Sequence, residues 1–442
     1  MKKLYLLLAV VVVVATSCQK DVVENIPCND PMTEEPCSPY AVSKEEALDK
    51  LYKEFALIYG AATRANDRRV RKIEPVRYDK LAPATRSTVA DVEDLLYIVE
   101  FEDGKGSAIL GADKRVEGVF AVLDEGVITA EDFDNAANGV ATDELNTYLA
   151  GLIADEAIEQ MSRSIITPIL PPIPDELRVT YVIRDTVANY QEPPILYTHW
   201  DQKGTYNDYC LNNIGEECDA GPLTIAMAQL LLAVEYPNRH TITIGNESFS
   251  RSILSEKRYN GNANVTVDDE VARYVHCVGV NLGNDYLYEQ LNESFNSALT
   301  FLNRYGWHMN EDIATATFDK VSDYVYTQKR PALISGYNTY APSQIHYWLI
   351  DGVSHTSYYE TLYTYEGNKL ISIEPQGLQS WTKVHANFGK AGRSDGFYSW
   401  GIFNVSRELA DEDVVSDVGD LPIAIGGNRN YSAELKILPY NL

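Results

Sequence analysis

The sequence predicts an α+β protein built from two folded domains. Its 442 residues exceed the roughly 100–200 residues of an ordinary domain. Residues 41–160 read as helix, short strands and helix, which is a compact α+β unit. A proline-rich stretch over 166–195 then lacks sustained periodicity, and a tyrosine- and tryptophan-rich part follows it. We therefore expect a domain over 41–160, a proline-rich linker over 161–190 and a second domain over 191–442.

The first residues, "MKKLYLLLAVVVVVATSCQKD", indicate a bacterial lipoprotein signal. Two lysines precede an apolar run from Leu4 to Ala15, and small residues precede Cys18. The run is shorter than the ~20 residues that a transmembrane helix needs. We expect residues 1–17 to be removed, Cys18 to be lipidated and the polar segment 18–40 to act as a tether. The protein is thus expected in the bacterial cell envelope, as a membrane-anchored lipoprotein that is periplasmic or surface-exposed.

The strong negative charge excludes one class of partner. Thirty-seven Lys and Arg residues face 64 Asp and Glu residues, so the net charge is −27. Such a chain repels the phosphates of DNA and RNA. We expect no nucleic-acid partner, and membrane attachment only through lipid on Cys18.

The six cysteines leave the redox state open. They lie at positions 18, 28, 37, 210, 218 and 277. Local disulfides between Cys28 and Cys37 and between Cys210 and Cys218 compete equally with a fully reduced state. No C-x-x-C pair or His/Cys cluster has the spacing of metal ligands, so we expect neither a metal site nor a cofactor.

The first domain has clear element signals. Ser43 followed by Glu46 forms a capping box, and Leu51, Phe55 and Ile58 give the next helix one apolar face. Residues 95–123 alternate strand-forming runs with turns, which predicts an antiparallel meander. The leucines and isoleucines of 143–161 then recur at helical spacing.

Three segments of the second domain carry functional groups that look ordinary when taken alone. In "DAGPLTIAMAQLLL", Pro222 suits the first position of a helix, where a missing N–H costs nothing. His346 lies in the strand-like run "QIHYWLIDG", where a hydrogen-bonded structural histidine is the simpler interpretation. Asn387 lies in "VHANFGKAGRSDGFY", which reads as a glycine-rich turn between strands.

Together these segments resemble the streptopain family, papain-like cysteine peptidases of bacteria. The strings "YTHWDQ", "AGPLTIAMAQLLLAVEYP", "DDEVARYVHCVGV", "LISGY", "IHYWLIDG" and "VHANFG" follow one another in the family's order, over about residues 195–405. Upstream, "SAILGADKRVEGVFAVLDEG" is similar to the strand-rich propeptide of those enzymes. The resemblance implies a papain-like fold preceded by a small propeptide-like domain with an antiparallel sheet.

The resemblance also implies residue roles. Aligning "AMAQ" places Pro222 where the family has its nucleophilic cysteine, and Gly221 on the preceding glycine. His346 falls on the base, Gln202 on the donor to the oxyanion hole and Asn387 on the asparagine beside the histidine. The expected substrate-binding positions are Trp200, Gly221, Ile345, Phe388 and Lys390.

Several of these positions depart from the family. Pro222 has no thiol and no ionisable atom, so it cannot form an acyl-enzyme. Ile345 replaces a glycine, and Phe388 and Lys390 replace tryptophans. We therefore expect a catalytically inactive homologue whose cleft binds a peptide or protein. The alternative is an active peptidase with a displaced nucleophile such as Cys218. Without self-cleavage, the N-terminal domain should stay attached and docked on the cleft.

Overall fold

The computed structural model describes most of the two predicted domains. The described residues are 38, 40–59, 68–81, 92–139, 145–166, 178–234, 240–258, 264–305, 312–338, 341–366, 369–403 and 433–440. The predicted signal peptide, the lipidation site Cys18 and nearly all of the tether lie outside them. The described helices include none that is long and apolar enough to cross a membrane.

The chain divides into a larger and a smaller unit. The larger unit comprises Glu35–Ile169, Asn189–His355 and Trp381–Leu442. The described part of the smaller unit comes from Leu170–Ala188 and Thr356–Ser380. The larger unit contains both the N-terminal α+β region and the region with the candidate site residues, so its internal contacts relate the two regions.

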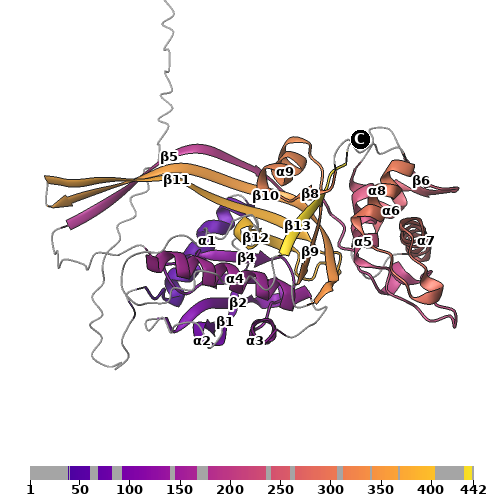
Figure 1. Ribbon diagram of the computed structural model, residues 1–442, viewed down its shortest axis with the longest axis horizontal. Helices are drawn as coiled ribbons and strands as arrows, with labels where there is room; N and C mark the ends of the chain where they lie inside the picture. The colour runs from indigo at the N-terminus through magenta and orange to yellow at the C-terminus, as the bar shows by residue number, and fades with distance from the viewer. Residues whose placement is uncertain are drawn as a thin grey trace, which may run out of the picture. The chain divides into compact units, whose positions relative to one another are not determined.

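The N-terminal region is helix, meander and helix, as predicted (Figure 1). Its elements are α1 (Lys44–Tyr59), β1 (Val70–Arg77), α2 (Tyr78–Leu81), β2 (Asp94–Phe101), η2 (Glu102–Gly104), β3 (Ser107–Gly111), β4 (Val119–Leu123), α3 (Ala130–Ala137) and α4 (Leu145–Ile166). Ser43 Oγ accepts the N–H of Glu46 at 3.1 Å, which confirms the predicted helix start. Strand β1 and helix α3 were not foreseen.

Both faces of the meander are buried, because its strands alternate between two apolar clusters. Tyr97, Val99 and Phe101 pack with Leu51 and Phe55 of α1. Residues at the alternate positions pack with α3 and α4. This explains why β2 reads as the nearly unbroken apolar run "DLLYIVEF" rather than as an alternating strand.

The second region starts with a group of helices. Figure 1 shows α5 to α8 lying together. Its elements are η3 (Gly204–Asn207), α5 (Pro222–Ala233), β6 (Thr241–Ile244), β7 (Glu247–Ser250), α6 (Arg251–Glu256), α7 (Val265–Leu282), η4 (Tyr286–Tyr288) and α8 (Phe295–Arg304). From Leu223 to Leu232 every residue of α5 is buried. Helix α5 is therefore a central helix that is buried on all sides, with Thr224 and Gln229 as its polar residues.

The rest of the second region is mostly antiparallel sheet. Its elements are β8 (Ala314–Thr315), α9 (Phe318–Ser322), the π-helix η5 (Asp323–Thr327), β9 (Ala332–Asn338), β10 (Ala341–Glu366), β11 (Lys369–Asn387), β12 (Gly396–Ser399), α10 (Trp400–Phe403) and β13 (Ala433–Leu438). In the described chain the strand order is β1-β2-β3-β4-β12-β11-β10-β9-β13-β8, and β5 (Arg178–Glu192) pairs with β10. The two regions therefore share one sheet through the β4–β12 pair.

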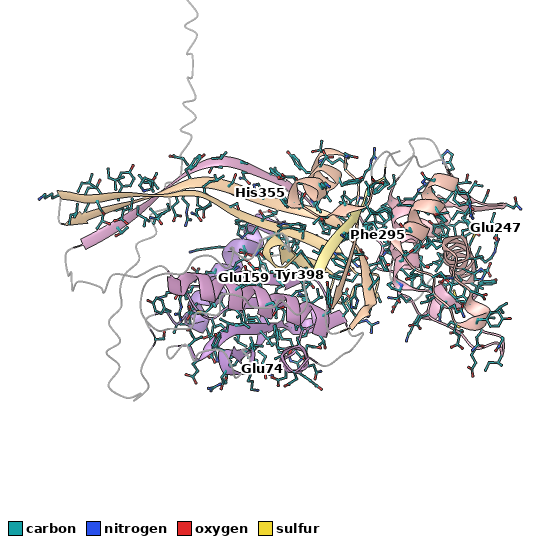
Figure 2. The ribbon with its side chains drawn as sticks, viewed as in Figure 1. Glu74, Glu159, Glu247, Phe295, His355 and Tyr398 are labelled. Carbon is teal, nitrogen blue, oxygen red and sulfur yellow. The ribbon has the colours of Figure 1, made fainter. Side chains whose placement is uncertain are left out.

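The smaller unit is a ribbon formed by the distal parts of β5, β10 and β11. Its side chains project from both faces (Figure 2). Arg184 pairs with Glu360 at 2.9 Å, and Tyr181 meets Tyr365 edge to face with ring centroids 5.5 Å apart. The chain between Asp351 and His385 thus forms most of a pair of extended strands, β10 and β11.

The linker prediction for 161–190 differs from the structure at both ends. Helix α4 continues to Ile166, and Arg178–Glu192 forms the strand β5. The residues "RVTYVIRDTVANYQE" are rich in Val, Ile, Thr and Tyr, which favour strands. The prolines upstream of them belong to 167–177, which lie outside the described residues.

Candidate functional site

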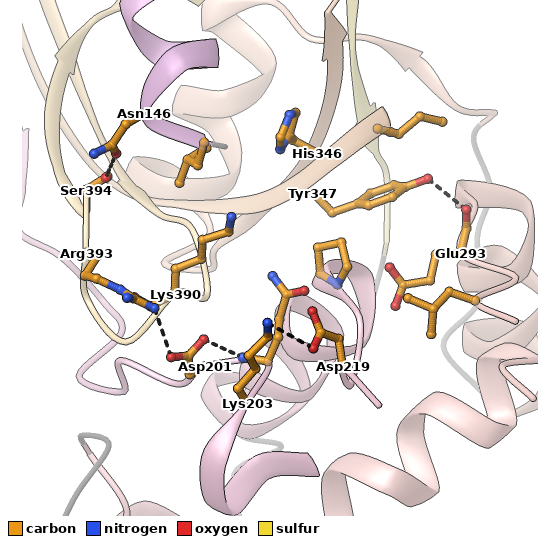
Figure 3. Close-up of a pocket in the computed structure, with 15 residues that line it drawn as sticks. Asn146, Asp201, Lys203, Asp219, Glu293, His346, Tyr347, Lys390, Arg393 and Ser394 are labelled. Carbon is orange, nitrogen blue, oxygen red and sulfur yellow. Dashed lines mark hydrogen bonds and ion pairs between the residues drawn. The ribbon is translucent and has the colours of Figure 1, made fainter. Parts of the chain in front are cut away.

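The candidate site residues surround one cavity of about 730 Å³ within the larger unit. Gln202, Pro222, Ile345, His346 and Lys390 all line it, although they come from four separate parts of the chain. Figure 3 shows His346, Lys390 and Glu293 around the cavity, and Pro222, which also lines it, begins helix α5. The structure thus brings together the positions of nucleophile, base and oxyanion donor.

Pro222 is the first residue of α5, as its place in the sequence predicted. Gly221 precedes it as the N-cap with φ of 100°, a left-handed value that suits glycine. A glycine N-cap has no side chain to accept the first N–H groups of the helix. Those groups, on Leu223 and Thr224, must find another acceptor.

Glu293 supplies that acceptor. Its Oε2 accepts the N–H of Leu223 at 2.8 Å, and its Oε1 accepts the N–H of Thr224 at 3.0 Å. The Thr224 hydroxyl donates to the same Oε1 at 2.9 Å. Burial raises the pKa of Glu293, although these hydrogen bonds oppose the rise. A carboxylate therefore caps the helix end at which the sequence resemblance places the nucleophile position.

His346 lies on β10 opposite Gly336 of β9. Its ring stacks on Tyr148 of α4, with centroids 4.6 Å apart and an angle of 23° between the planes. The neighbouring Tyr347 hydroxyl donates to the Glu293 carbonyl at 3.1 Å. A side chain of the N-terminal region therefore covers one face of the histidine.

Charged side chains line the rest of the cavity. Lys203 pairs with Asp219 at 3.4 Å, and Arg393 pairs with Asp201 at 3.2 Å (Figure 3). Among the described residues, no group of three or more His, Cys, Asp or Glu side chains is arranged to hold a metal ion. The cavity thus presents charges of both signs beside the apolar Pro222 and Ile345.

Three expected site residues are structural instead, which corrects their assigned contacts. Asn387 is buried, donates to the Thr198 carbonyl at 2.9 Å and accepts from Gln229 of α5 at 3.0 Å. Trp200 is fully buried and donates to the Lys257 carbonyl at 2.6 Å. Phe388 packs against Trp348 with centroids 5.8 Å apart. None of the three is among the described residues that line the cavity.

The N-terminal region is docked on the same site. Leu145 and Asn146, at the start of α4, line the cavity, and Ser394 Oγ donates to Asn146 Oδ1 at 2.5 Å. Strand β4 pairs with β12 in antiparallel register, Phe397 opposite Val122. The docking that we expected is therefore present, and it leaves the cavity partly open.

Buried charges join the two regions beneath the shared sheet. His385 of β11 contacts Asp351 at 2.6 Å and Asp124, directly after β4, at 3.1 Å. Burial alone would lower the pKa of His385, but the two carboxylates raise it to about 10. Asp124 also pairs with Arg68 at 2.9 Å, and Lys383 pairs with Glu117 at 2.5 Å. The His385–Asp124 and Lys383–Glu117 pairs join the two regions, and we call them, with the partners Asp351 and Arg68, the seam.

Cys218 lies at a neighbouring depression, which shares Asp219 and Leu291 with the cavity. That depression, of about 390 Å³, is lined by Cys218 together with Glu216, Glu217 and Glu289, among others. The thiol donates to the Tyr286 carbonyl at 3.6 Å. Burial, with the nearby carboxylates, raises the pKa of Cys218, which keeps it a thiol. Cys210, Cys218 and Cys277 are all free, whereas Cys28 and Cys37 lie outside the described residues.

The family comparison agrees with this geometry. Residues 200–398 match the model of the Peptidase C10 family. Two solved structures, both from Prevotella intermedia, are similar. A prointerpain A fragment with the mutation C154A is 16% identical with a TM-score of 0.47, covering 84% of this chain and 97% of its own. Active interpain A cysteine protease is 20% identical with a TM-score of 0.32, covering 47% and 85%. No curated protein matched.

The chain is therefore a cysteine-peptidase-like protein with an N-terminal domain. The match to the model of the C10 peptidases, the streptopain family, over residues 200–398 confirms the resemblance seen in the sequence. The predicted α+β class, with antiparallel strands in the N-terminal region, is confirmed as well.

The sequence analysis missed several residues at the cavity and at the seam. Glu293 lies in the loop "LNESF", which carries no recognisable motif, and its acceptor role depends on a helix 70 residues away. Tyr148 looks like one more apolar residue of α4. His385 and Lys383 share one face of β11, but only their partners in the N-terminal region make them informative.

Proposed function

We propose that this protein is a lipid-anchored, catalytically inactive homologue of the C10 peptidases that binds a peptide or protein segment in its cavity. The observation that carries the proposal is Pro222 at the start of α5, facing the cavity that His346 and Gln202 also line. No atom of proline can attack a carbonyl group. The base and the oxyanion donor position are present, but the nucleophile is absent from its place.

The N-terminal domain supports the same proposal. An active member of the family removes its propeptide by its own cleavage, and a chain without a nucleophile should not. Here the domain shares the sheet through β4 and β12, and its Tyr148 stacks on His346. We infer that it remains attached and forms one wall of the binding cavity, as a permanent part of the protein.

The cavity lining supports a peptide as the ligand. Ile345 is 40% exposed and Leu291 is 41% exposed, and both offer apolar contact at the cavity. The charged side chains of Lys203, Asp201 and Lys390 lie within the same cavity. Such a mixture suits a segment with apolar and charged side chains and polar backbone groups. Anchoring through lipid on Cys18, in the bacterial cell envelope, follows from the signal-like N-terminus and is part of the proposal.

Hydrolysis assays test the loss of activity. The purified chain should not cleave casein or fluorogenic peptides, and it should not label with thiol-directed peptidase probes. Its intact mass should stay constant during long incubation in a protease-free preparation. Turnover that disappears in a His346→Ala variant, or spontaneous release of the N-terminal domain, would overturn the proposal.

A peptidase with Cys218 as its nucleophile is the competing function. The geometry disfavours it, because Cys218 lines another depression and its thiol is held in the neutral form. Attack requires nucleophile and base within hydrogen-bond reach. Cys218→Ala should therefore leave every measured property unchanged, whereas a cleavage activity abolished by this substitution would establish the competing function.

A further inference from the structure

The amino end of α5 is already occupied by an anion. Both oxygens of the Glu293 carboxylate accept hydrogen bonds from the first turn of the helix, at 2.8 and 3.0 Å. Asn284 Nδ2 donates to the Thr224 hydroxyl at 3.0 Å and lies 3.5 Å from Glu293 Oε1. All of the groups that contact the carboxylate oxygens are therefore donors, as an ionised carboxylate requires.

The fit at this end of the helix is close. A Cβ atom added to Gly221 would lie 2.0 Å from Glu293 Oε1 and 2.7 Å from its carboxyl carbon. The carboxylate is thus packed against the N-cap itself, directly beside Pro222. Its own backbone is fixed by Tyr347, whose hydroxyl donates to the Glu293 carbonyl at 3.1 Å.

This position matters because a helix amino end stabilises one negative charge in its immediate vicinity. The aligned peptide dipoles and the free N–H groups of the first turn favour an anion there, and the effect is confined to that turn. A thiolate placed at residue 222 would have to share those N–H groups with Glu293. It would also lie beside a like charge, which disfavours ionisation.

We propose that Glu293 is the internal anion that takes the place of the missing thiolate at the amino end of α5. The proposal rests on the proposed function, since it explains what the helix end does in a chain without a nucleophile. It follows that Pro222→Cys alone does not regenerate a reactive thiolate. Both Glu293 and the proline prevent a reactive thiolate from forming at position 222.

The test is the titration of an introduced thiol. Pro222→Cys is made in a Cys218→Ala background, because the other two described cysteines are buried. The rate of alkylation by iodoacetamide is followed by intact mass as a function of pH. We expect a pKa at or above the ordinary value of about 8.5. Adding Glu293→Gln should lower this pKa by about one unit or more and speed alkylation at pH 7 about fivefold.

A matched control uses the other carboxylate beside the helix start. Asp219 also lines the cavity but pairs with Lys203 instead of the helix N–H groups. Asp219→Asn should therefore shift the pKa of the introduced thiol much less than Glu293→Gln does. A pKa below about 7 with Glu293 intact, or equal shifts from the two substitutions, would overturn the proposal.

The unaltered chain provides a second measurement in case Glu293→Gln does not fold. Amide hydrogen exchange should show protection of Leu223 and Thr224, and this protection should weaken as pH falls and Glu293 is protonated. Protection that does not respond to pH would contradict the proposal. Peptide hydrolysis by the unaltered chain would overturn the proposed function instead, because the titration is read on a residue that this chain lacks.

Discussion

Two parts of the molecule, the amino end of α5 and the seam, differ in the contacts that their charged side chains make. At α5 a proline begins the helix, and the neighbouring Glu293 carboxylate accepts the N–H groups of its first turn. At the seam, His385 pairs with Asp124 and Lys383 pairs with Glu117 between the two regions, and His385 also pairs with Asp351 of its own region. Under the proposed function, a chain that cannot release its N-terminal domain by its own cleavage also keeps the contacts that hold this domain in place.

This contrast predicts where the protein is sensitive to substitution. Buried charges that lose a partner are expensive, since the remaining charge stays desolvated. A proline at a helix start, by comparison, contributes through the stiffness of one residue. Substitutions at the seam should therefore destabilise the protein far more than substitutions of Pro222.

Asp124→Asn should have the largest effect. Asp124 contacts His385, Arg68 and the Tyr59 hydroxyl, at 3.1, 2.9 and 2.8 Å. Removing its charge should reduce the free energy of unfolding by about 3–5 kcal/mol, measured by urea denaturation. Asp49→Asn, which breaks the exposed pair with Lys53, is the control and should cost less than about 1 kcal/mol. Equal losses of unfolding free energy in the two variants would mean that the ion pairs of the seam stabilise the protein no more than an exposed ion pair does.

The pH dependence of stability should report the same seam. The pKa of His385 is raised to about 10 in the folded chain, against about 6.5 when unfolded. The ionised ring therefore stabilises the fold fully below about pH 6.5, and this contribution is lost as pH rises toward 10.

Thermal unfolding at several pH values measures this loss. The melting temperature should fall between about pH 7 and 10, and the fall should be shallower in Asp124→Asn, because one of the two carboxylates that raise the pKa is then neutral. A parallel fall in both proteins would assign the pH dependence to other groups.

The sequence predicted the elements better than their connections. Pro222, Ser43 and the meander are local signals, and the structure has the expected helix starts and strands there. Strand β5 was read as linker because prolines dominate the residues before it. The residues of β10 that pair with β5 lie more than 150 residues later in the chain, so no local sequence pattern predicts the pairing.

The site residues were likewise predicted where a motif pointed to them and missed where their role depends on distant contacts. Resemblance located Pro222, His346 and Gln202 at one cavity. Glu293 and Tyr148 act only through contacts with distant elements, and these contacts exist only once the chain is folded. Asn387 was assigned to the histidine, but its amide joins Gln229 to the Thr198 carbonyl, since buried amides must satisfy both donor and acceptor.

Asn146→Ala should have a moderate effect at the edge of the seam. Its side chain accepts from Ser394 and donates to the Val127 carbonyl at 3.0 Å. Losing these two hydrogen bonds should cost about 1–2 kcal/mol, measured by urea denaturation. Asn138→Ala is a matched control, since this exposed amide contacts only the neighbouring Asp134 carbonyl in the described chain. A loss no greater than in Asn138→Ala would show that this contact does not fasten α4 to the cavity.

Pro222→Ala should have the smallest effect. Alanine adopts the same helical backbone and adds an N–H that can face the cavity, so nothing buried is left without a partner. The remaining difference is the greater freedom of the unfolded chain, which should cost about 0.4–1 kcal/mol in urea denaturation. Because Glu293 still accepts the N–H groups of Leu223 and Thr224, the helix start itself should persist. A loss above about 2 kcal/mol would mean that the proline supports the fold as much as the seam does.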